Sequence, residues 1–366
     1  MKRRQTRPDS ACRCAARAAA AALAAALATA AGCAPRPAAP PPARAAWTAM
    51  STFAAVSAAG ADAARLDEYA AAAAQTMQDL EQRLSRFDPQ SEIGRLNAAA
   101  GGPAIALSAP AAAVLGLAQH YAQVSGGAFD VTIGPLAAVW GLRGGRAPAE
   151  PPPPAAIRAA LERVGSRHLV LSNGWARLDR PGMEVDLGGI AKGFAVDACF
   201  DRLRALGAVN VMVDLGGNLR CGGEPRPGEP WKIGVRHPFD RERIVGVLAL
   251  GAGQAVATSG NYERFVTIGG VRYAHILDPR RGRPVQGMAG VTVVSTNAVE
   301  ADAMSTALFV LGLEEAPVAL RRLPGCRALL IPDRQPLEIW LSPGCGELFT
   351  PARGFRSAVR PLTLAP

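Results

Sequence analysis

The stretch Val291–Gly312 reads VTVVSTNAVEADAMSTALFVLG and joins an expected strand to an expected helix. Residues 291–295 alternate and are rich in β-branched side chains, which favours a strand. Asn297 is a good N-cap residue, and Glu300 three positions later completes a capping-box pattern. Apolar side chains then recur at helical spacing, and Gly312 is a natural stop. The stretch therefore predicts a strand, a turn and an amphipathic helix.

Two oxygen-bearing side chains stand near the start of this helix. Asp302 and Thr306 are four residues apart, so they share one helical face. A carboxylate and a hydroxyl are hard oxygen ligands of the kind that Mg²⁺ binds. A solvated Asp302 and a Thr306 hydrogen-bonded to its own helix also agree with this spacing. The spacing alone leaves both interpretations open.

The composition of the chain bounds the class of protein. Its 366 residues can bury a large core in one domain or two lobes. The formal charge is +10, but six basic residues and one acidic residue lie within residues 1–32. The remaining charges are scattered, with no run of Lys or Arg and no interleaved aromatics. The sequence therefore gives no support for a nucleic-acid partner.

Residues 1–32 have the features of an export signal. An arginine-rich segment precedes an Ala/Leu run at 18–31, which is too short to span a membrane as a mature helix. Small residues directly before Cys33 resemble a bacterial lipobox, which predicts a lipid on Cys33; ordinary cleavage nearby is the alternative. Residues 33–45 are Pro-rich and predict an extended tether. We expect a folded domain over 46–350, a tail over 351–366, and a lipid anchor on the periplasmic side of the inner membrane.

The cysteines do not form a metal motif. After removal of a signal segment and lipidation of Cys33, the mature chain keeps Cys199, Cys221, Cys326 and Cys345, with no CxxC pair. In an oxidising compartment Cys326 and Cys345 could form a disulfide. The sequence does not decide whether they do.

Hairpins and helices mix along the chain without regular βαβ alternation, which predicts an α+β fold with mixed or antiparallel sheets flanked by helices. Further helices are expected over residues 65–87, 91–97, 109–124, 155–164 and 194–206. Further strands are expected over residues 47–57, 168–171, 176–178, 209–214, 231–237, 244–250, 254–259, 266–268 and 271–276.

A glycine-rich turn, DLGGIAKG at residues 186–193, separates a strand from a helix. Glycines let the main chain approach a ligand closely, and a helix start favours anions. Lys192 would lie in the first helical turn, within reach of a phosphate. The turn matches neither GxxxxGK[ST] nor GxGxxG, so neither nucleotide-binding fingerprint applies. A purely structural turn remains the alternative.

His275 precedes the turn Leu277-Asp278-Pro279 and is one of four histidines. The ordinary pKa of histidine makes it a suitable proton acceptor in an attack by a hydroxyl group. A hydrogen-bonded histidine with no catalytic role fits the sequence equally well.

Several motifs together give a resemblance to a known family. They are SRFDPQSEIGRLN at 85–97, GGAFDVTIGPL at 126–136, VDLGGIAKGFAVD at 185–197, VDLGGN at 213–218, TSGNYERF at 258–265, HILDP at 275–279 and EADAMSTALFVLG at 300–312. In this order and spacing they resemble the ApbE family, the FAD:protein FMN transferases. The resemblance extends from about Met50 to Gly312.

The resemblance implies a two-lobed single catalytic unit, exported and often lipidated. Such a protein uses Mg²⁺ to move FMN from FAD onto a Thr or Ser hydroxyl of a target protein and releases AMP. The implied metal ligands are the main-chain carbonyl at Gly189 and the side chains of Asp302 and Thr306. The implied acid/base residue is His275, with Lys192 beside the phosphates. The implied FAD contacts are Met50, Phe87, Ala128, Phe129, Asp130, Asp186, Lys192 and Ile276.

Two positions depart from the family pattern. The usual Met-Gly-Thr is Met50-Ser51-Thr52, and Phe87 stands where Tyr is common. Phe87 can stack on a ring but cannot donate a hydrogen bond, which affects how the flavin is oriented.

The residues themselves fit the implied chemistry. Mg²⁺ and Lys192 would neutralise charge on the departing AMP, while His275 or Asp186 would take the proton of the attacking hydroxyl. The acceptor is then expected to be an exported or membrane redox subunit. With water as the nucleophile, the same site would make a Mg²⁺-dependent FAD pyrophosphatase that yields FMN and AMP. A tethered flavin-binding lipoprotein without catalysis is the alternative of another class.

Overall fold

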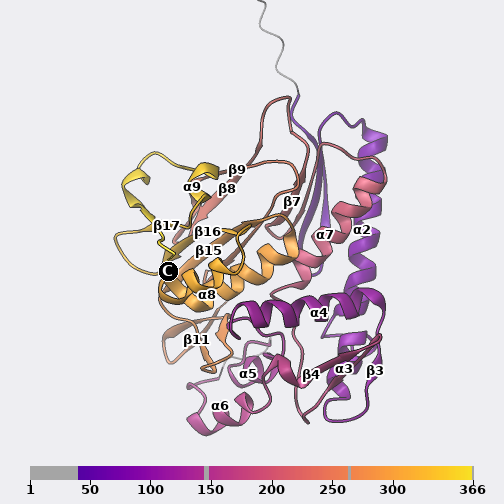
Figure 1. The fold of residues 1–366 in the computed structure, drawn as a ribbon, viewed down its shortest axis with the longest axis vertical. Helices are drawn as coiled ribbons and strands as arrows, with labels where there is room; N and C mark the ends of the chain where they lie inside the picture. The colour runs from indigo at the N-terminus through magenta and orange to yellow at the C-terminus, as the bar shows by residue number, and fades with distance from the viewer. Residues whose placement is uncertain (1–39, 144–147, 263–264, 365–366) are drawn as a thin grey trace, which may run out of the picture. The chain divides into compact units, whose positions relative to one another are not determined.

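A nine-stranded sheet is the framework of this computed structural model, which describes residues 40–143, 148–262 and 265–364 (Figure 1). Its strands, in spatial order, are β1 (Ala43–Ala49), β2 (Thr52–Ala58), β6 (Val211–Leu215), β7 (Asn218–Gly222), β10 (Ala255–Gly260), β15 (Met288–Ser295), β16 (Arg327–Pro332), β17 (Ile339–Leu341) and β19 (Val359–Pro361). Neighbours are antiparallel except β17 and β19, which are parallel. The predicted α+β class with mixed, mainly antiparallel sheets is confirmed.

Helices cover one face of this sheet. They are α2 (Ala63–Leu84), α7 (Ala191–Ala205) and α8 (Ala298–Arg321), and α4 (Ala109–Val124) packs on α8. Strand residues alternate between faces, so Val291 and Val293 point toward the helices whereas Val294 points the other way. The main core therefore lies between the sheet and the helices.

A smaller sheet packs against the opposite face. It consists of β18 (Phe349–Pro351), β9 (Asp240–Leu250) and β8 (Trp231–His237). Trp231, Leu248 and Phe349 join a second apolar cluster with residues from the central strands. The Trp231 indole donates to the Gly222 carbonyl at 3.2 Å, which fixes the smaller sheet to β7. The central sheet is thus buried on both faces along its middle strands.

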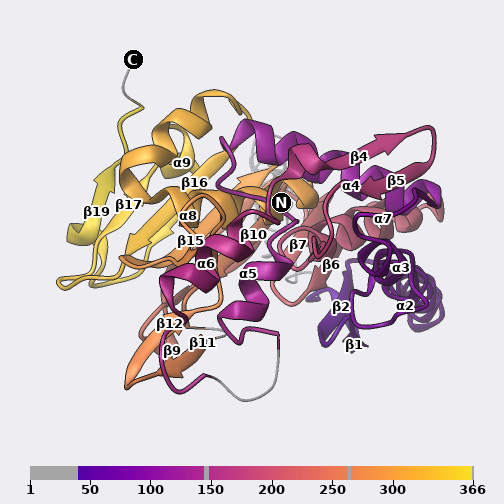
Figure 2. The same ribbon diagram turned by 90° about the horizontal axis from the view of Figure 1, so that it is seen from below.

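A third apolar cluster lies where α5 (Gly134–Val139) and α6 (Pro154–Leu161) meet two hairpins (Figure 2). The hairpins are β11–β12 (Phe265–Ile268 and Val271–Ala274) and β13–β14 (Leu277–Asp278 and Arg283–Pro284). The Trp140 indole donates to the Gly282 carbonyl at 2.8 Å. The remaining α-helices and strands are α3 (Glu92–Ala98), β3 (Ile105–Ala106), β4 (Leu169–Ser172), β5 (Trp175–Leu178) and α9 (Cys345–Leu348), and two short 3-10 helices span Ser166–His168 and Arg356–Ala358.

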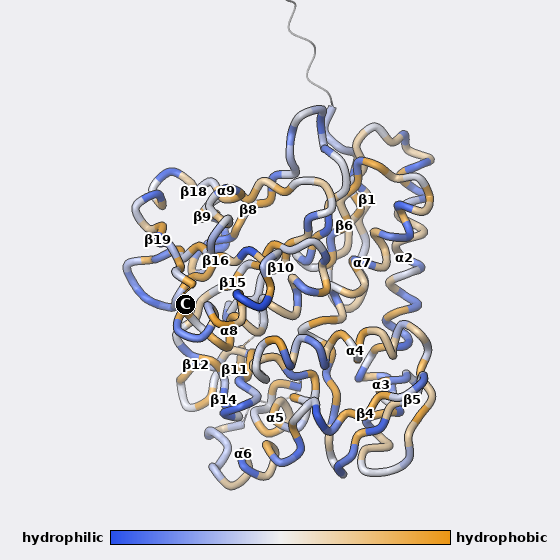
Figure 3. The backbone as a smooth tube through the Cα atoms, in the orientation of Figure 1, coloured by the Kyte–Doolittle hydropathy of each residue, from blue (hydrophilic) through white to orange (hydrophobic). Residues whose placement is uncertain are grey.

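The predicted helices are confirmed to within a few residues. Helix α2 buries Tyr69, Ala73, Met77, Leu80 and Leu84, the apolar positions that recur at helical spacing. Figure 3 shows apolar and polar positions alternating along this helix. Helix α4 has the predicted bounds, and α7 begins at Ala191, so Lys192 lies in its first turn.

Only one of the two hydrogen bonds of the predicted capping box forms at the start of α8. The Asn297 side chain accepts from the Glu300 N–H at 2.8 Å, as predicted. The Glu300 carboxylate, however, accepts from the Ser295 hydroxyl. Asp197, on α7, instead accepts from the N–H groups of Ala298 and Val299, each at 2.9 Å. The helix start is therefore completed by a neighbouring helix, which ties α7 to α8.

The predicted end of the helix at Gly312 is wrong, because Gly312 only interrupts α8 and the helix resumes after it. Its φ of 62° and ψ of −165° lie in a region that residues with a Cβ avoid. Among the described helices, only α8 is long and apolar enough to cross a membrane. Because 67% of that window is buried inside the fold, α8 packs as a core helix.

Three predictions about strands and boundaries are wrong. Residues 47–57 are a hairpin and not one strand, because Met50 and Ser51 adopt φ of 48° and 60° and turn the chain. Strand β1 begins at Ala43, so the end of the expected tether pairs within the sheet. The expected tail supplies β19, an edge strand. The expected signal segment and Cys33 lie outside the described residues.

The disulfide considered for Cys326 and Cys345 does not form. Cys199, Cys221, Cys326 and Cys345 are buried free thiols. Cys326 belongs to the cluster on the helical side of the sheet and Cys345 to the cluster on the other side, so the sheet separates their surroundings. Burial raises the pKa of Cys345 to about 12, which keeps it protonated at neutral pH.

Replacing Gly312 by Ala should lower the free energy of unfolding by about 1–3 kcal/mol, because alanine is strained at this φ and ψ. The matched control is Gly116→Ala inside α4, where an added Cβ meets nothing within 4 Å. That change should stabilise the protein by about 0.5–1 kcal/mol. Urea unfolding of both variants measures the difference, and equal effects would contradict the strained geometry.

Candidate functional site

The glycine-rich turn and the start of α8 meet at a close crossing of α7 and α8. The Gly193 N–H donates to one Asp302 carboxylate oxygen at 2.9 Å, and Lys192 Nζ lies 3.4 Å from the other. A Cβ at Gly193 would lie 2.3 Å from the Ala298 carbonyl oxygen. Only glycine therefore permits this approach. The crossing brings together residues 110 positions apart in sequence.

Thr306 lies beside the glycine-rich turn as well. A Cβ at Gly189 would lie 3.3 Å from Thr306 Oγ1 and 3.2 Å from the Phe129 ring. Thr306 Oγ1 is also 3.3 Å from Ser259 Oγ, which is 2.9 Å from Ser305 Oγ. The structure therefore places Gly189 and Thr306 in contact range, and Asp302 lies one helical turn before Thr306. Ser259, within TSGNYERF, adds a hydroxyl that the sequence analysis did not single out.

The donor set fits Mg²⁺ better than a metal that needs several acidic or imidazole ligands. Within the described residues, no group of three His, Cys, Asp or Glu side chains could hold a metal ion. One carboxylate, one hydroxyl and one main-chain carbonyl suit Mg²⁺, which keeps several waters and shares its coordination with substrate phosphates. The missing side chain at Gly189 leaves room beside the Thr306 hydroxyl. These residues fit an ion held jointly with a phosphate ligand.

Asp186 is held by Arg86 at the entrance of the same turn. Arg86 Nε lies 2.9 Å from one Asp186 carboxylate oxygen, and the other accepts from the Gly188 N–H at 2.9 Å. One contact on each oxygen therefore orients the Asp186 carboxylate, and its role as a proton acceptor stays a prediction. The Arg86 guanidinium also lies 4.1 Å from the centre of the Phe87 ring. Phe87 is 72% exposed, which leaves it accessible to a planar ligand.

Arg86 was missed by the sequence analysis, although it precedes Phe87 in the SRF motif. It also lies 3.9 Å from Glu184, which forms an ion pair with Arg143. Burial, and then the positive charge of Arg86, lower the pKa of Arg143. Two arginines and two carboxylates thus organise this side of the turn.

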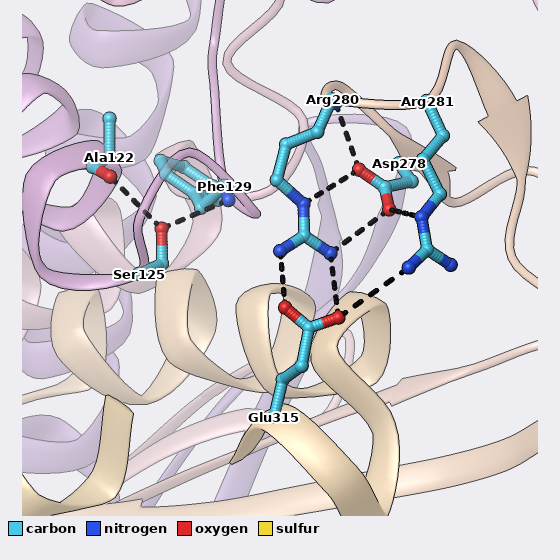
Figure 4. Close-up of polar contacts among 7 residues, drawn as sticks. All are labelled: Ala122, Ser125, Phe129, Asp278, Arg280, Arg281 and Glu315. Carbon is cyan, nitrogen blue, oxygen red and sulfur yellow. Dashed lines mark hydrogen bonds and ion pairs between the residues drawn. The ribbon is translucent and has the colours of Figure 1, made fainter. Parts of the chain in front are cut away.

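Ala128 and Phe129 lie in a loop after α4 and are buried. The Phe129 N–H donates to the Ser125 hydroxyl at 3.0 Å, and that hydroxyl donates to the Ala122 carbonyl at 3.2 Å (Figure 4). These contacts fix the loop on the end of α4, with the Phe129 ring beside Gly189.

Asp130 has a clear role in holding this loop. Its carboxylate accepts from the Thr132 N–H at 2.8 Å, the Thr132 hydroxyl at 2.7 Å and the Ser166 N–H at 2.7 Å. The side chain is 9% exposed. Its implied contact with FAD stays a prediction.

Met50 lies at the turn between β1 and β2. Its N–H donates to the Glu81 carboxylate of α2 at 3.0 Å. VDLGG occurs twice in the sequence, at 185–189 and at 213–217. The turn between β1 and β2 lies against the second of these segments, since a Cβ at Gly216 would be 2.7 Å from Thr52 Oγ1. Asp214 of that segment accepts from the Gly217 N–H at 3.0 Å, which resembles the Asp186–Gly188 contact of the first copy.

His275 and Ile276 occupy the connection between β12 and β13. His275 is partly buried and Ile276 is buried. The Ile276 carbonyl accepts from the Val285 N–H at 2.9 Å, which fixes the start of the turn. The catalytic role of His275 stays a prediction.

Comparison with known proteins gives one consistent assignment. Residues 50–330 match the ApbE family. The chain belongs to the ApbE family. It is 30% identical over 299 residues to an FAD:protein FMN transferase of Salmonella typhimurium, covering 80% of this chain and 85% of that one. It is 36% identical over 248 residues to one of Klebsiella pneumoniae, covering 66% and 75%.

Solved structures agree with the ApbE family assignment. The flavin transferase ApbE from Vibrio cholerae matches with a TM-score of 0.74 and 29% identity, over 84% of this chain and 100% of that chain. The ApbE protein from Thermotoga maritima matches with a TM-score of 0.71 and 28% identity, over 87% and 99%. The family resemblance and the α+β fold predicted from the sequence are both confirmed.

A Gly189→Ala variant should need about tenfold more Mg²⁺ for half-maximal binding in the presence of FAD, because its Cβ crowds Thr306 Oγ1. Calorimetric titration measures the affinity, and thermal unfolding checks the fold. Gly251→Ala is the control, since its Cβ has only an ordinary contact at 3.7 Å. An unchanged Mg²⁺ titration in a folded Gly189→Ala protein would remove Gly189 from the metal site.

Proposed function

We propose that this ApbE family chain is a transferase that moves FMN from FAD onto a Thr or Ser hydroxyl of a protein and uses Mg²⁺ to do so. The observation that supports the proposal is the convergence of Gly189, Lys192, Asp302 and Thr306 at the α7–α8 crossing. The family assignment supplies the transfer of FMN from FAD to a protein. The metal and the Thr or Ser acceptor are the parts that the motif resemblance implies and that we propose here.

The described residues suit transfer at a pyrophosphate. Lys192 places a cation beside Asp302, and the N-terminus of α7 adds the positive end of a helix dipole. Asp302, Thr306 and the Gly189 carbonyl would hold Mg²⁺, which supplies charge neutralisation when bound. In the transfer, the acceptor oxygen bonds to the FMN phosphorus and the bond to the bridging oxygen breaks, so AMP leaves. His275 takes the hydroxyl proton.

Water in place of the acceptor hydroxyl would give FMN and AMP from the same site. Release of AMP from FAD in the absence of an acceptor protein measures this reaction. Binding of FAD without any AMP release, with or without acceptor, would identify a flavin-binding protein with no catalysis.

We also propose where the reaction takes place. The export signal over residues 1–32 and the lipobox-like sequence before Cys33 favour a lipid anchor on the periplasmic side of the inner membrane. The acceptor would then be an exported or membrane redox subunit. Metabolic labelling with a fatty acid, in cells expressing the chain or its Cys33→Ser variant, tests the anchor.

Asp302→Ala should abolish transfer while the fold persists, because it removes the carboxylate that lies beside Lys192 and accepts from the Gly193 N–H. The assay incubates enzyme, FAD, Mg²⁺ and candidate exported redox subunits, and mass spectrometry detects an added FMN. Asp67→Ala, at an exposed position of α2, is the matched control. An Asp302→Ala enzyme that transfers FMN at the wild-type rate would exclude the metal from the mechanism.

His275→Ala should lower the transfer rate by about 10²–10⁴-fold, the usual contribution of a general base. The transfer rates of the wild type and the variant are measured across a range of pH. The variant should still bind FAD, and the quenching of FAD fluorescence measures this binding. His120→Ala, at an exposed position on α4, controls for the substitution. A His275→Ala enzyme with the same rate and pH profile as wild type would refute this role.

A further inference from the structure

A cluster of charges lies directly after the His275 turn (Figure 4). The Asp278 side chain is 6% exposed. The Arg280 guanidinium donates two hydrogen bonds to it, Nε to Oδ1 and Nη2 to Oδ2, each at 3.0 Å. The Arg280 N–H also donates to Asp278 Oδ1 at 2.8 Å. A planar guanidinium bound in this paired way holds a carboxylate in a defined orientation. Arg280 is therefore fixed relative to the turn.

The same guanidinium reaches across to α8. Arg280 Nη1 lies 2.6 Å from one Glu315 carboxylate oxygen, and Nη2 lies 3.4 Å from the other. Arg281, which is 73% exposed, contributes only longer contacts of 3.7 and 3.8 Å to the two carboxylates. The hydrogen bonds that Arg280 donates to Asp278 and then to Glu315 raise its pKa, so it stays charged at every pH of interest.

Arg280 also lies close to the loop that carries Ala128 and Phe129. A Cβ at Gly127 would be 3.8 Å from Arg280 Cγ. One side chain thus contacts or adjoins three segments with predicted site residues. These are the turn with His275 and Ile276, the loop with Phe129, and α8 with Asp302 and Thr306.

The α8 contact matters because Gly312 interrupts this helix. Asp302 and Thr306 lie before Gly312, and Glu315 lies after it. After the break, side-chain contacts hold the segment: Ala316, Ala319 and Leu320 pack in the main core, and the Glu315 carboxylate pairs with Arg280. The Arg280–Glu315 pair is such a contact between the His275 turn and α8.

We propose that Arg280 and Glu315 are positioning residues that fix the His275 turn against α8 and so align His275 with Asp302 and Thr306. The inference rests on the proposed role of His275. Neither residue needs to touch the substrate. Small misplacements of a catalytic group reduce rates strongly, so a partly exposed ion pair can have a large effect on turnover and a small one on stability.

Glu315 is the better residue to change. Removing Arg280 would leave the buried Asp278 carboxylate without its main partner, and the protein would lose stability. In Glu315→Gln, Arg280 keeps its bonds to Asp278, and only the connection to α8 is weakened. Glu314→Gln is the matched control, because it makes the same change at the adjacent, exposed position of the same helix.

The experiment measures single-turnover FMN transfer to an acceptor protein at saturating FAD and Mg²⁺. We expect Glu315→Gln to transfer about tenfold more slowly than Glu314→Gln, within the range known for small misplacements of reacting groups. The affinity for FAD and the unfolding temperature should match those of Glu314→Gln. Glu315→Asp should recover part of the rate. An equal rate in the two glutamine variants would overturn the inference.

A double-mutant cycle tests whether Glu315 acts through His275. In a His275→Ala background, Glu315→Gln should cause no further loss, because there is no imidazole left to align. Independent, multiplicative losses would contradict the inference. If His275→Ala is slow but Glu315→Gln is normal, only the positioning role fails. If His275→Ala transfers at the wild-type rate, the proposed role of His275 is wrong. The proposed alignment of His275 by Arg280 and Glu315 is then wrong as well.

Discussion

The hydrogen bond from the Gly193 N–H to Asp302 is the contact on which the site depends. It requires that α7 and α8 cross with no side chain at Gly193, and it uses one carboxylate oxygen of Asp302. The other oxygen is left beside Lys192. Because Asp197 of α7 also caps the start of α8, the two helices are joined at two successive turns of α7. The crossing is thereby fixed before any ligand binds.

The central sheet supplies the rigid base for this crossing. Strands β10 and β15 are buried under α8, and the small sheet covers their other face. The hydroxyl of Ser259, at the end of β10, lies within hydrogen-bond distance of the Ser305 and Thr306 hydroxyls. The Thr306 hydroxyl is therefore held by the sheet as well as by α8. Residues of the site thus stand on elements whose positions are set by two apolar cores.

Patterns within short stretches of the sequence predict much of this arrangement. The features that they miss depend on contacts between residues that are far apart in the sequence. The Asn297 cap and the apolar stripe of α2 are visible because they lie within one helix. The turn at Met50-Ser51 was missed because a β-turn with positive φ at two non-glycine residues has no strong local pattern. Asp197, Arg86 and Ser259 were missed because each acts on a partner that folding, and not sequence, brings near. The motif order identified the family but not these supporting contacts.

The charge balance at the crossing bears on how the proposed metal and FAD bind. The free site pairs one carboxylate, Asp302, with one ammonium group, Lys192, at 3.4 Å, so its net charge is close to zero. A divalent cation placed there alone would be attracted by Asp302 and repelled by Lys192, so the two charges oppose each other. The two negative charges of a pyrophosphate reverse this balance, since they attract the lysine and the metal together. A site with this charge pattern favours binding of Mg²⁺ and FAD as a unit over binding of either one alone.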